Sequence, residues 1–424
     1  MRRVLMVCYH FPPAGGIASV RAARFVRHLP AEGWEPLVVS SNVCVLGVDA
    51  SLTWGDARVS RAYRLPLSRL SGLRPASEVL AESARSPRFV NWVRSLVRSW
   101  IHIPDAEIGW VPFAVLEAMR AIRARPVQAV YSSAYPMSAH LVAWIVHRIT
   151  GIPWVAEYRD LWSNWVGHRG LRQRLNVALE RALVREASAV VTVSDTYAEE
   201  FRKRGARRAE VITNGYDPSD FSGGAPVPDV DLAYLGTYYP EAQDLRAVLR
   251  AMAEMAASPK GPTPRLRLIG RYPPSIAEEA SRLGIEPLIE ATGLIAHDEA
   301  MRSMRAARVL VFSGPVPCDG PHLVGNVAAK VFEYMASGRP VLAVAHPDAD
   351  VVTLLASCPQ LRVVPPDDVA GARQAIIDLL RAGPGAGATA HAPAPCNASA
   401  PSVETFSSAS LTRRLAALLD DVGH

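Results

Sequence analysis

The sequence is poor in lysine and cysteine, and it lacks a long apolar run. Only three of its 46 basic residues are lysines: Lys203, Lys260 and Lys330. The five cysteines are scattered, odd in number and without metal-site spacing, so neither a disulfide framework nor a cysteine-based metal centre is expected. No stretch of about 18 apolar residues occurs, which argues against a membrane-spanning helix. We therefore expect a reduced, cytoplasmic protein.

The remaining composition is that of a globular protein, with 49% apolar and 20% charged residues. A chain of 424 residues is too long for one ordinary core, so two or more domains are expected. The net charge of +6 fits an anionic ligand or a membrane surface. Nucleic-acid binding is not expected, because the arginines are spread over amphipathic helices without a recognised binding module.

The most informative stretch runs from Gly325 to Ala343 and predicts a loop, a short helix and a buried strand. Asn326 is a candidate N-cap, because its side chain can accept a hydrogen bond from the first turn. Gly338 is a candidate C-terminal cap. Residues 341–344 form an apolar run of strand length.

Lys330 and Glu333 are three residues apart in this predicted helix, so they share one face. A helix N-terminus presents unpaired N–H groups and the positive end of the helix dipole, which suits a phosphate. A cation near the helix start and a carboxylate one turn further in match a pyrophosphate followed by a ribose diol. From the residues alone, a surface Lys–Glu pair on an ordinary helix is an equal alternative.

A strand, a glycine-containing loop and a helix are predicted over residues 4–30, and a second strand over residues 35–40. The unit is therefore βαβ, and its sheet is parallel. Gly15 and Gly16 would let backbone amides approach a phosphate without hindrance from a Cβ atom. A plain tight turn is the alternative for these two glycines.

Polar residues follow other predicted strands, at the edge where parallel sheets bind ligands. Arg159 and Asp160 are candidates for contacts to a sugar hydroxyl or an acceptor, with a local salt bridge as the alternative. Arg271 follows a strand and a glycine, and is a candidate donor to a diphosphate or an exposed loop residue. His140, on a predicted helix, is either catalytic or structural.

Glycine and proline become frequent near residues 222–228, which indicates a domain boundary. We expect one domain over residues 1–222 and a second over 228–382. An Ala/Pro-rich segment over 383–403 should be flexible, and a C-terminal helix should follow within 404–424.

A basic, tryptophan-bearing amphipathic helix is predicted over residues 85–103. Such a helix can lie on an anionic membrane, which would make the protein peripheral at the inner face of the membrane. The alternatives are that it packs on its domain or lines an acceptor cleft.

Six segments resemble, in this order, the glycosyltransferases of family 4, which have the two-domain GT-B fold. They are Tyr9–Gly16 with Arg21, Glu157–Trp162, Val191–Ser194, Asn214–Asp217, Tyr234–Thr237 and Ala329–Ala343. The resemblance implies an α/β protein in which two Rossmann-like domains face each other across a cleft. It also implies that the C-terminal helix crosses back to the N-terminal domain.

The resemblance further implies a UDP-linked or other nucleotide-diphosphate sugar held mainly by the C-terminal domain. The residues that would bind this donor are Gly15, Gly16, Gly236, Arg271, Asn326, Val327, Lys330 and Glu333. The residues that would bind a hydroxyl-bearing acceptor are Tyr135, Arg159 and Asp160. The catalytic candidates are Lys330, Arg271 and His140. Family members retain the anomeric configuration without a metal, so no metal or other cofactor is expected.

Two departures from the family pattern concern the donor sugar. The first glutamate of the family's usual pair would fall at Gly325, and no histidine aligns with the family position near residues 133–136. A GT-B sugar-nucleotide epimerase, a phosphorylase and a non-catalytic nucleotide-binding protein therefore stay open. A saccharide, a lipid-linked saccharide and a small natural product such as an antibiotic core are all candidate acceptors. The sequence indicates neither the sugar, the linkage nor the oligomeric state.

Overall fold

The computed structural model describes residues 1–44, 48–66, 103–164, 170–222, 226–240, 242–258, 261–316, 320–356, 358, 360–382 and 402–423. The chain divides into two compact units. One comprises Met1–Val193, Tyr197–Ile212 and Thr412–His424, and the other Ser194–Thr196 and Thr213–Leu411. The division after Ile212 falls earlier than the boundary expected near residue 222. The helix expected at 85–103 and nearly all of the Ala/Pro-rich segment lie outside the described residues.

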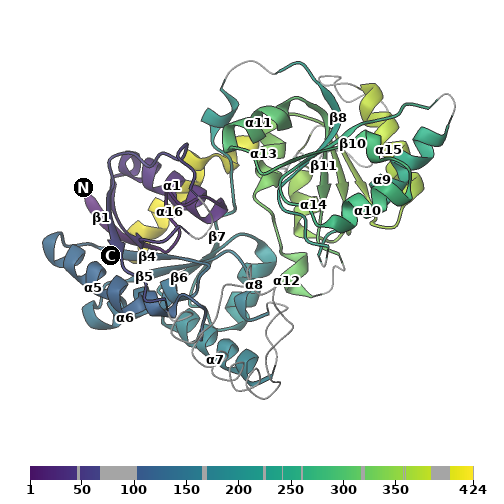
Figure 1. The fold of residues 1–424 in the computed structure, drawn as a ribbon. Coiled ribbons are helices and arrows are strands. Elements are labelled where there is room, and N and C mark those ends of the chain that lie inside the picture. Colours follow the sequence, from purple (N-terminus) through teal and green to yellow (C-terminus); the bar gives the residue numbers. More distant parts are fainter. Residues whose placement is uncertain are drawn as a thin grey trace. The chain divides into compact units, whose positions relative to one another are not determined.

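The first unit contains a seven-stranded parallel sheet in the order β3-β2-β1-β4-β5-β6-β7 (Figure 1). Its strands are β1 Arg2–Cys8, β2 Trp34–Ser41, β3 Arg58–Ala62, β4 Ala129–Ala134, β5 Trp154–Tyr158, β6 Ala189–Thr192 and β7 Ala209–Val211. The helices between them are α1 Ile17–His28, α5 Val111–Ala124, α6 Ser138–Thr150, α7 Gly170–Glu186 and α8 Asp195–Lys203.

The second unit contains a six-stranded parallel sheet in the order β10-β9-β8-β11-β12-β13. Its strands are β8 Val230–Leu235, β9 Leu266–Ile269, β10 Ile289–Gly293, β11 Ala307–Ser313, β12 Val341–Val344 and β13 Leu361–Val364. Its helices are α9 Arg246–Ala257, α10 Pro274–Arg282, α11 His297–Arg305, α12 Pro321–Val324, α13 Lys330–Ser337, α14 Asp350–Leu355 and α15 Val369–Ala382.

Both sheets have the Rossmann strand order: the first strands are added toward one edge of the sheet, and the later strands are added toward the other edge. We call the point between the two groups the strand reversal. The reversal falls between β1 and β4 in the first unit and between β8 and β11 in the second. Open parallel sheets bind their ligands outside the carboxyl ends of the strands at such a reversal. The fold therefore predicts one ligand-binding edge in each unit.

Successive side chains of β8 point to opposite faces of the sheet, and nearly all of them are buried, as a sheet covered on both faces requires. Leu232 and Tyr234 pack with α9 and α15 on one face. Ala233 and Leu235 pack with α11, α13 and α14 on the other. The second unit thus has an apolar core on each side of its sheet.

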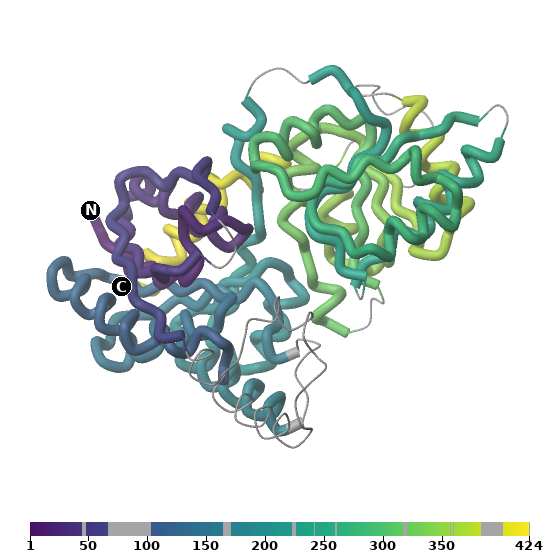
Figure 2. Tube along the Cα trace, in the orientation of Figure 1, coloured from purple at the N-terminus to yellow at the C-terminus, as the bar shows by residue number. Residues whose placement is uncertain are grey.

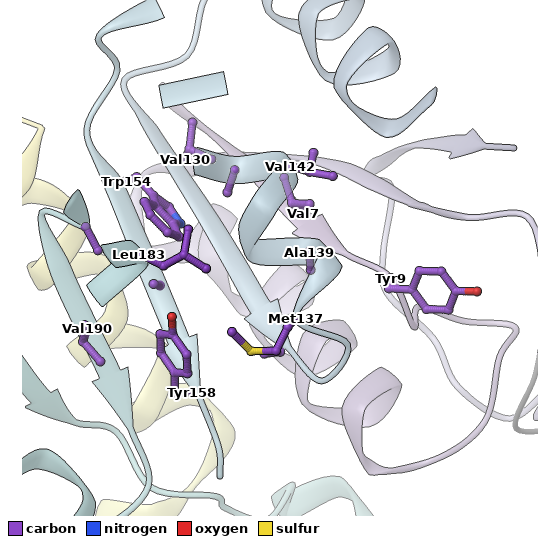
Figure 3. Close-up of a cluster of buried hydrophobic side chains, with 14 of the residues drawn as sticks. Val7, Tyr9, Val130, Met137, Ala139, Val142, Trp154, Tyr158, Leu183 and Val190 are labelled. Carbon is purple, nitrogen blue, oxygen red and sulfur yellow. The ribbon is translucent and has the colours of Figure 1, made fainter. Parts of the chain in front are cut away.

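One core of the first unit lies between its sheet and the helices α5, α6, α7 and α8. Figure 3 shows part of it, with Trp154 and Tyr158 of β5 beside Leu183 of α7 and Met137 just before α6. Trp154 and Tyr158 are almost completely buried. Large aromatic side chains of this kind bury much apolar area and account for a large share of core stability.

The C-terminal helix α16, Ser408–Val422, contributes its residues from Thr412 onward to the first unit. The Trp34 indole N–H donates to an Asp420 carboxylate oxygen at 2.7 Å, and Arg2 forms an ion pair with the same residue at 2.7 Å. Figure 2 shows this last, yellow segment returning to the purple start of the chain. The expectation that the final helix joins the N-terminal domain is confirmed for these residues.

None of the described helices combines the length and apolar content that crossing a membrane requires.

Candidate functional site

Lys330 occupies the strand reversal of the second sheet. It is the first residue of α13, and its Nζ donates to the carbonyl of Leu235, the last residue of β8, at 2.9 Å. The Nζ atom lies 3.8 Å from the centre of the Tyr234 ring and 5.5 Å from that of Phe312 in β11. Both strands that flank the reversal therefore contact this side chain.

The surroundings of Lys330 are apolar, and this affects its charge. Burial lowers the pKa of Lys330 from 10.5 to about 7. Among the described residues, no carboxylate forms an ion pair with it. An arriving anion would supply the missing counter-charge and raise the pKa again.

Two glycines keep the space next to Lys330 open. Gly236 has φ +106°, and a Cβ atom there would lie 3.8 Å from the Lys330 Nζ. Gly270 has φ +133°, and its Cβ would lie 2.4 Å from the Gly236 carbonyl oxygen, which is closer than real Cβ atoms come. The loops after β8 and β9 can therefore approach each other only because Gly270 carries no side chain.

Arg271 follows Gly270 and is exposed. Its carbonyl accepts a hydrogen bond from the Tyr238 N–H at 3.0 Å, so the loop after β9 is tied to the loop after β8. The structure thus brings Lys330, Gly236 and Arg271 to neighbouring strand ends of one sheet.

The prediction that Asn326 caps the helix was wrong. The helix begins at Lys330 with Ala329 as its N-cap, while the Asn326 N–H donates to the Leu323 carbonyl in the turn after α12. Asn326 therefore belongs to the turn that follows α12 and does not lie next to the start of α13. Gly338, by contrast, is the left-handed C-cap that was predicted, with φ +66°.

Glu333 lies in the first turn of α13 and is 8% exposed. Val327 is buried, and its carbonyl accepts a hydrogen bond from the Asn214 side chain at 3.2 Å. The expected strand at 341–344 is β12, and Val331, Phe332 and Met335 are buried against it and its neighbours. Lys330 and Glu333 are thereby held on a helix whose other face belongs to the core.

In the first unit, the glycine loop follows β1 at the other strand reversal. Gly15 is buried, whereas Gly16 is exposed, has φ +91° and caps α1. The Arg61 guanidinium donates to the carbonyl of Pro12 and, at 2.8 Å, to the Ser40 hydroxyl. Arg61 of β3 thus holds the backbone that precedes the two glycines. The sequence did not indicate this contact.

The three predicted acceptor residues lie at the ends of two neighbouring strands. Tyr135 follows β4 and is 51% exposed. Arg159 and Asp160 follow β5, and the Arg159 Nε donates to the carbonyl of Ala134 at 2.9 Å. The structure brings these residues to one edge of the first sheet, where a polar ligand has access to them.

His140 lies inside the first unit rather than at this edge. It is fully buried, and its Nδ1 is hydrogen-bonded to the Ser132 hydroxyl at 2.7 Å. Burial lowers the pKa of His140 to about 3, so the imidazole is neutral at physiological pH. The ring lies beside Trp154 and Tyr158 in the core. Such an environment favours the structural alternative, and we assign His140 no catalytic role.

The helix that carries His140, α6, begins at Ser138, and the buried Asp105 side chain binds this first residue. The Asp105 carboxylate accepts the Ser138 N–H at 2.9 Å and the Ser138 hydroxyl at 2.6 Å. Burial raises the pKa of Asp105 to about 6 despite these hydrogen bonds.

A buried ion pair behind the strand reversal of the first sheet was not predicted. The Arg21 Nε donates to a Glu157 carboxylate oxygen at 2.9 Å, and the Ser133 hydroxyl donates to the other oxygen at 2.6 Å. Arg21 also donates to the carbonyl of Ile212 at 2.8 Å. Burial opposes ionisation of Glu157, but the charges of Arg21 and Arg159 and the Ser133 hydrogen bond outweigh it and lower the pKa of Glu157.

Family comparisons agree with this geometry. Residues 15–217 match the "Glycosyl transferase 4-like domain" family, and residues 229–382 match the "Glycosyl transferases group 1" family. The second match contains Gly236, Arg271, Lys330 and Glu333. No curated protein matches the chain.

Solved structures that the chain resembles share its fold at low sequence identity. HepE from Anabaena, in complex with UDP-glucose, is 16% identical over 99% of this chain and 100% of its own, with a TM-score of 0.62. A sucrose-phosphate synthase from Thermosynechococcus elongatus is 16% identical over 100% and 96% of the two chains, with a TM-score of 0.60. A Listeria monocytogenes protein assigned as a UDP-N-acetylglucosamine 2-epimerase is 12% identical over 99% and 96%, with a TM-score of 0.53.

Because transferases and an assigned epimerase share this fold, the fold alone does not identify the reaction. The two family matches identify the enzyme family, since together they span most of the chain and both describe glycosyltransferases. The chain belongs to the family-4-type glycosyltransferases and has the GT-B fold.

Proposed function

We propose that the protein transfers a sugar from a nucleotide-diphosphate sugar, UDP-linked in the first instance, to a hydroxyl group with retention of anomeric configuration. The observation that carries the proposal is the position of Lys330 at the strand reversal of the second sheet. HepE, a protein of the same fold, is described in complex with UDP-glucose, which supports UDP as the carrier.

In this proposal the bond between the anomeric carbon and the diphosphate oxygen breaks, and the acceptor oxygen bonds to the same carbon. The diphosphate leaves with the bonding electrons, and the proton of the acceptor hydroxyl passes to an oxygen of the departing diphosphate. Lys330 and Arg271 would neutralise the growing negative charge, and Glu333 would bind the ribose hydroxyls. Positive groups fixed in advance stabilise such charge without reorganisation, so we propose that no metal is needed.

On the first unit, the amide of Gly16 would contact the donor diphosphate, and Tyr135, Arg159 and Asp160 would contact the acceptor. The exposed edge that holds these three residues supports this role. A saccharide, a lipid-linked saccharide and a small natural product all present a suitable hydroxyl.

Thermal shift with a panel of nucleotides and nucleotide sugars tests the donor. A ligand at 100 times its dissociation constant stabilises the folded state by about 2.7 kcal/mol. We expect UDP and at least one UDP-sugar to raise the unfolding temperature, and the free nucleoside to do so much less. If a nucleotide sugar is isomerised without any acceptor, the protein is an epimerase. If no diphosphate binds, the proposal fails.

Replacing Glu333 by glutamine should weaken UDP binding but leave pyrophosphate binding unchanged, because only UDP carries a ribose. A hydrogen bond to a charged group contributes about 1.5–3 kcal/mol, so the dissociation constant for UDP should rise about 10- to 100-fold. Calorimetric titration with both ligands measures the two changes. An equal loss for both would assign Glu333 to the phosphates or to folding instead.

UDP binding should become weaker as the pH rises above 7. The pKa of Lys330 is about 7 without ligand, and a bound diphosphate favours the charged form and raises it. The affinity should therefore fall about tenfold per pH unit above pH 7, until the pKa of the complex is reached.

Binding at pH 8 should also take up about one proton per UDP, since the lysine is then mostly neutral before binding. Titrations in two buffers of different ionisation enthalpy measure this number. The Lys330→Met variant is the control and should take up none. A wild-type protein that binds UDP without proton uptake would contradict the role given to Lys330.

A further inference from the structure

The Lys330 ammonium rests on the face of the Tyr234 ring, 3.8 Å from its centre. An ammonium group has three N–H donors. One is used by the Leu235 carbonyl at 2.9 Å, and the ring face receives a second contact. At least one donor is then left for a ligand, and its direction is set by the other two contacts.

The Tyr234 ring is itself held in place. Its hydroxyl donates to the Gln243 side-chain oxygen at 3.0 Å, and the same oxygen accepts the Tyr239 N–H at 3.0 Å. The Tyr234 carbonyl accepts the Tyr272 hydroxyl at 3.0 Å. With no exposed surface and anchors at both ends, Tyr234 is a rigid support for Lys330.

An aromatic face can position a cation without cancelling its charge. A carboxylate partner would hold Lys330 more firmly, but it would neutralise the ammonium before a diphosphate arrived. The negative face of an aromatic ring attracts the cation and adds no net charge. Tyr234 thus keeps the lysine both fixed and available to an anion.

The helix α13 packs on the face of the sheet that carries Leu235, whereas Tyr234 points to the opposite face. The Lys330 side chain therefore reaches over the carboxyl end of β8 to meet the ring. Without the ring, the four-carbon side chain would have further rotamers, only some of which aim at the strand reversal.

We propose that Tyr234 is a positioning residue, which holds the Lys330 ammonium toward the leaving diphosphate through the face of its ring. This inference rests on the proposed function. Sugar transfer then requires the aromatic ring of Tyr234 but not its hydroxyl group.

Substitutions at this position test the ring. Tyr234→Phe should keep kcat within about threefold of wild type, whereas Tyr234→Leu should lower kcat about tenfold and change the donor KM less. Tyr238→Leu is the matched control, because it removes another neighbouring ring, 6.2 Å from Tyr234, and leaves both hydrogen bonds that anchor Tyr234 in place. It should cost less in kcat than Tyr234→Leu at a similar unfolding temperature.

A fluorinated series separates the ring's charge distribution from its volume. Phenylalanine with zero, one, two or three fluorine atoms, incorporated at position 234, keeps the shape but progressively weakens attraction to a cation. We expect log kcat to fall steadily along the series, by about a factor of ten in total. In the Lys330→Ala background the same series should show no change in kcat, because the ammonium group that the ring attracts is absent.

A series with no change in kcat, in a protein whose Lys330 is intact and which is otherwise active, would overturn the inference. Equal losses of kcat for Tyr234→Leu and Tyr238→Leu would overturn it too. These results differ from failure of the proposed function, in which the unmodified protein itself binds no UDP and transfers no sugar.

Discussion

Replacing Lys330 by alanine should lower kcat for sugar transfer by about 100- to 1000-fold, with a smaller change in the donor KM. Removing one fixed donor to developing negative charge costs about 2.7–4 kcal/mol in enzymes where this has been measured. Lys330 is the cation that contacts both strands at the reversal of the second sheet. Steady-state rates with the donor and acceptor pair from screening measure the effect.

The loss should appear mainly in kcat because the charge on the diphosphate grows as the glycosidic bond breaks. An interaction that is stronger in the transition state than in the ground state raises kcat, whereas one that is equal in both changes only KM. Lys330→Arg should recover part of the rate, because it keeps the charge. It should not recover all of it, because the planar guanidinium does not fit the space of a compact ammonium.

Lys203 offers a matched control for this experiment. It is the other lysine among the described residues, its side chain is 62% exposed, and it pairs with Glu200 on α8. Lys203→Ala should leave kcat and KM unchanged. Lys330→Ala should also keep the wild-type unfolding temperature, since it removes a cation that burial already disfavours. Near-normal transfer by Lys330→Ala would refute the assignment of this residue.

The main strands could be predicted because they are apolar runs bounded by glycine, proline or polar residues. β2 extends one residue beyond each end of the strand expected at 35–40, and β12 coincides with the strand expected at 341–344. β3 and β13 could not be recognised in this way. Both are four or five residues long and half exposed, so neither shows a continuous apolar run.

The site was predictable only where a residue type was rare or stood next to a glycine. Lys330 attracted notice because lysine is scarce in this chain, and Arg271 because it follows a strand and Gly270. The support of Lys330 by Tyr234 was not predictable, since the two residues are far apart in sequence and meet only at the end of the sheet. The role of His140 depended on burial, which a helical position does not reveal.

The buried pair of Arg21 and Glu157 was missed for the same reason, and it leads to the second large effect. Glu157→Ala should destabilise the first unit by about 3–5 kcal/mol, because it removes the carboxylate that pairs with the buried Arg21 guanidinium. For a domain of this size, the unfolding temperature should fall by about 6–20 °C. The Ser133 hydroxyl would lose its acceptor as well.

Tryptophan fluorescence can follow this loss in the first unit alone. All nine tryptophans lie at or before residue 165, and the first unit contains Met1–Val193. Glu117→Ala is the control, because it breaks the exposed pair with Arg120 in the same unit and should cost no more than about 1 kcal/mol.

Removing both partners separates the pair from its surroundings. The double variant Arg21→Met with Glu157→Leu removes both charges of the pair, so it should be more stable than Glu157→Ala alone. A double variant as unstable as the single one would mean that the hydrogen bonds of Arg21 to Ile212 and of Ser133 to Glu157, rather than the opposed charges, stabilise this region. Loss of the Ile212 contact would then matter most, because the chain leaves the first unit at that residue.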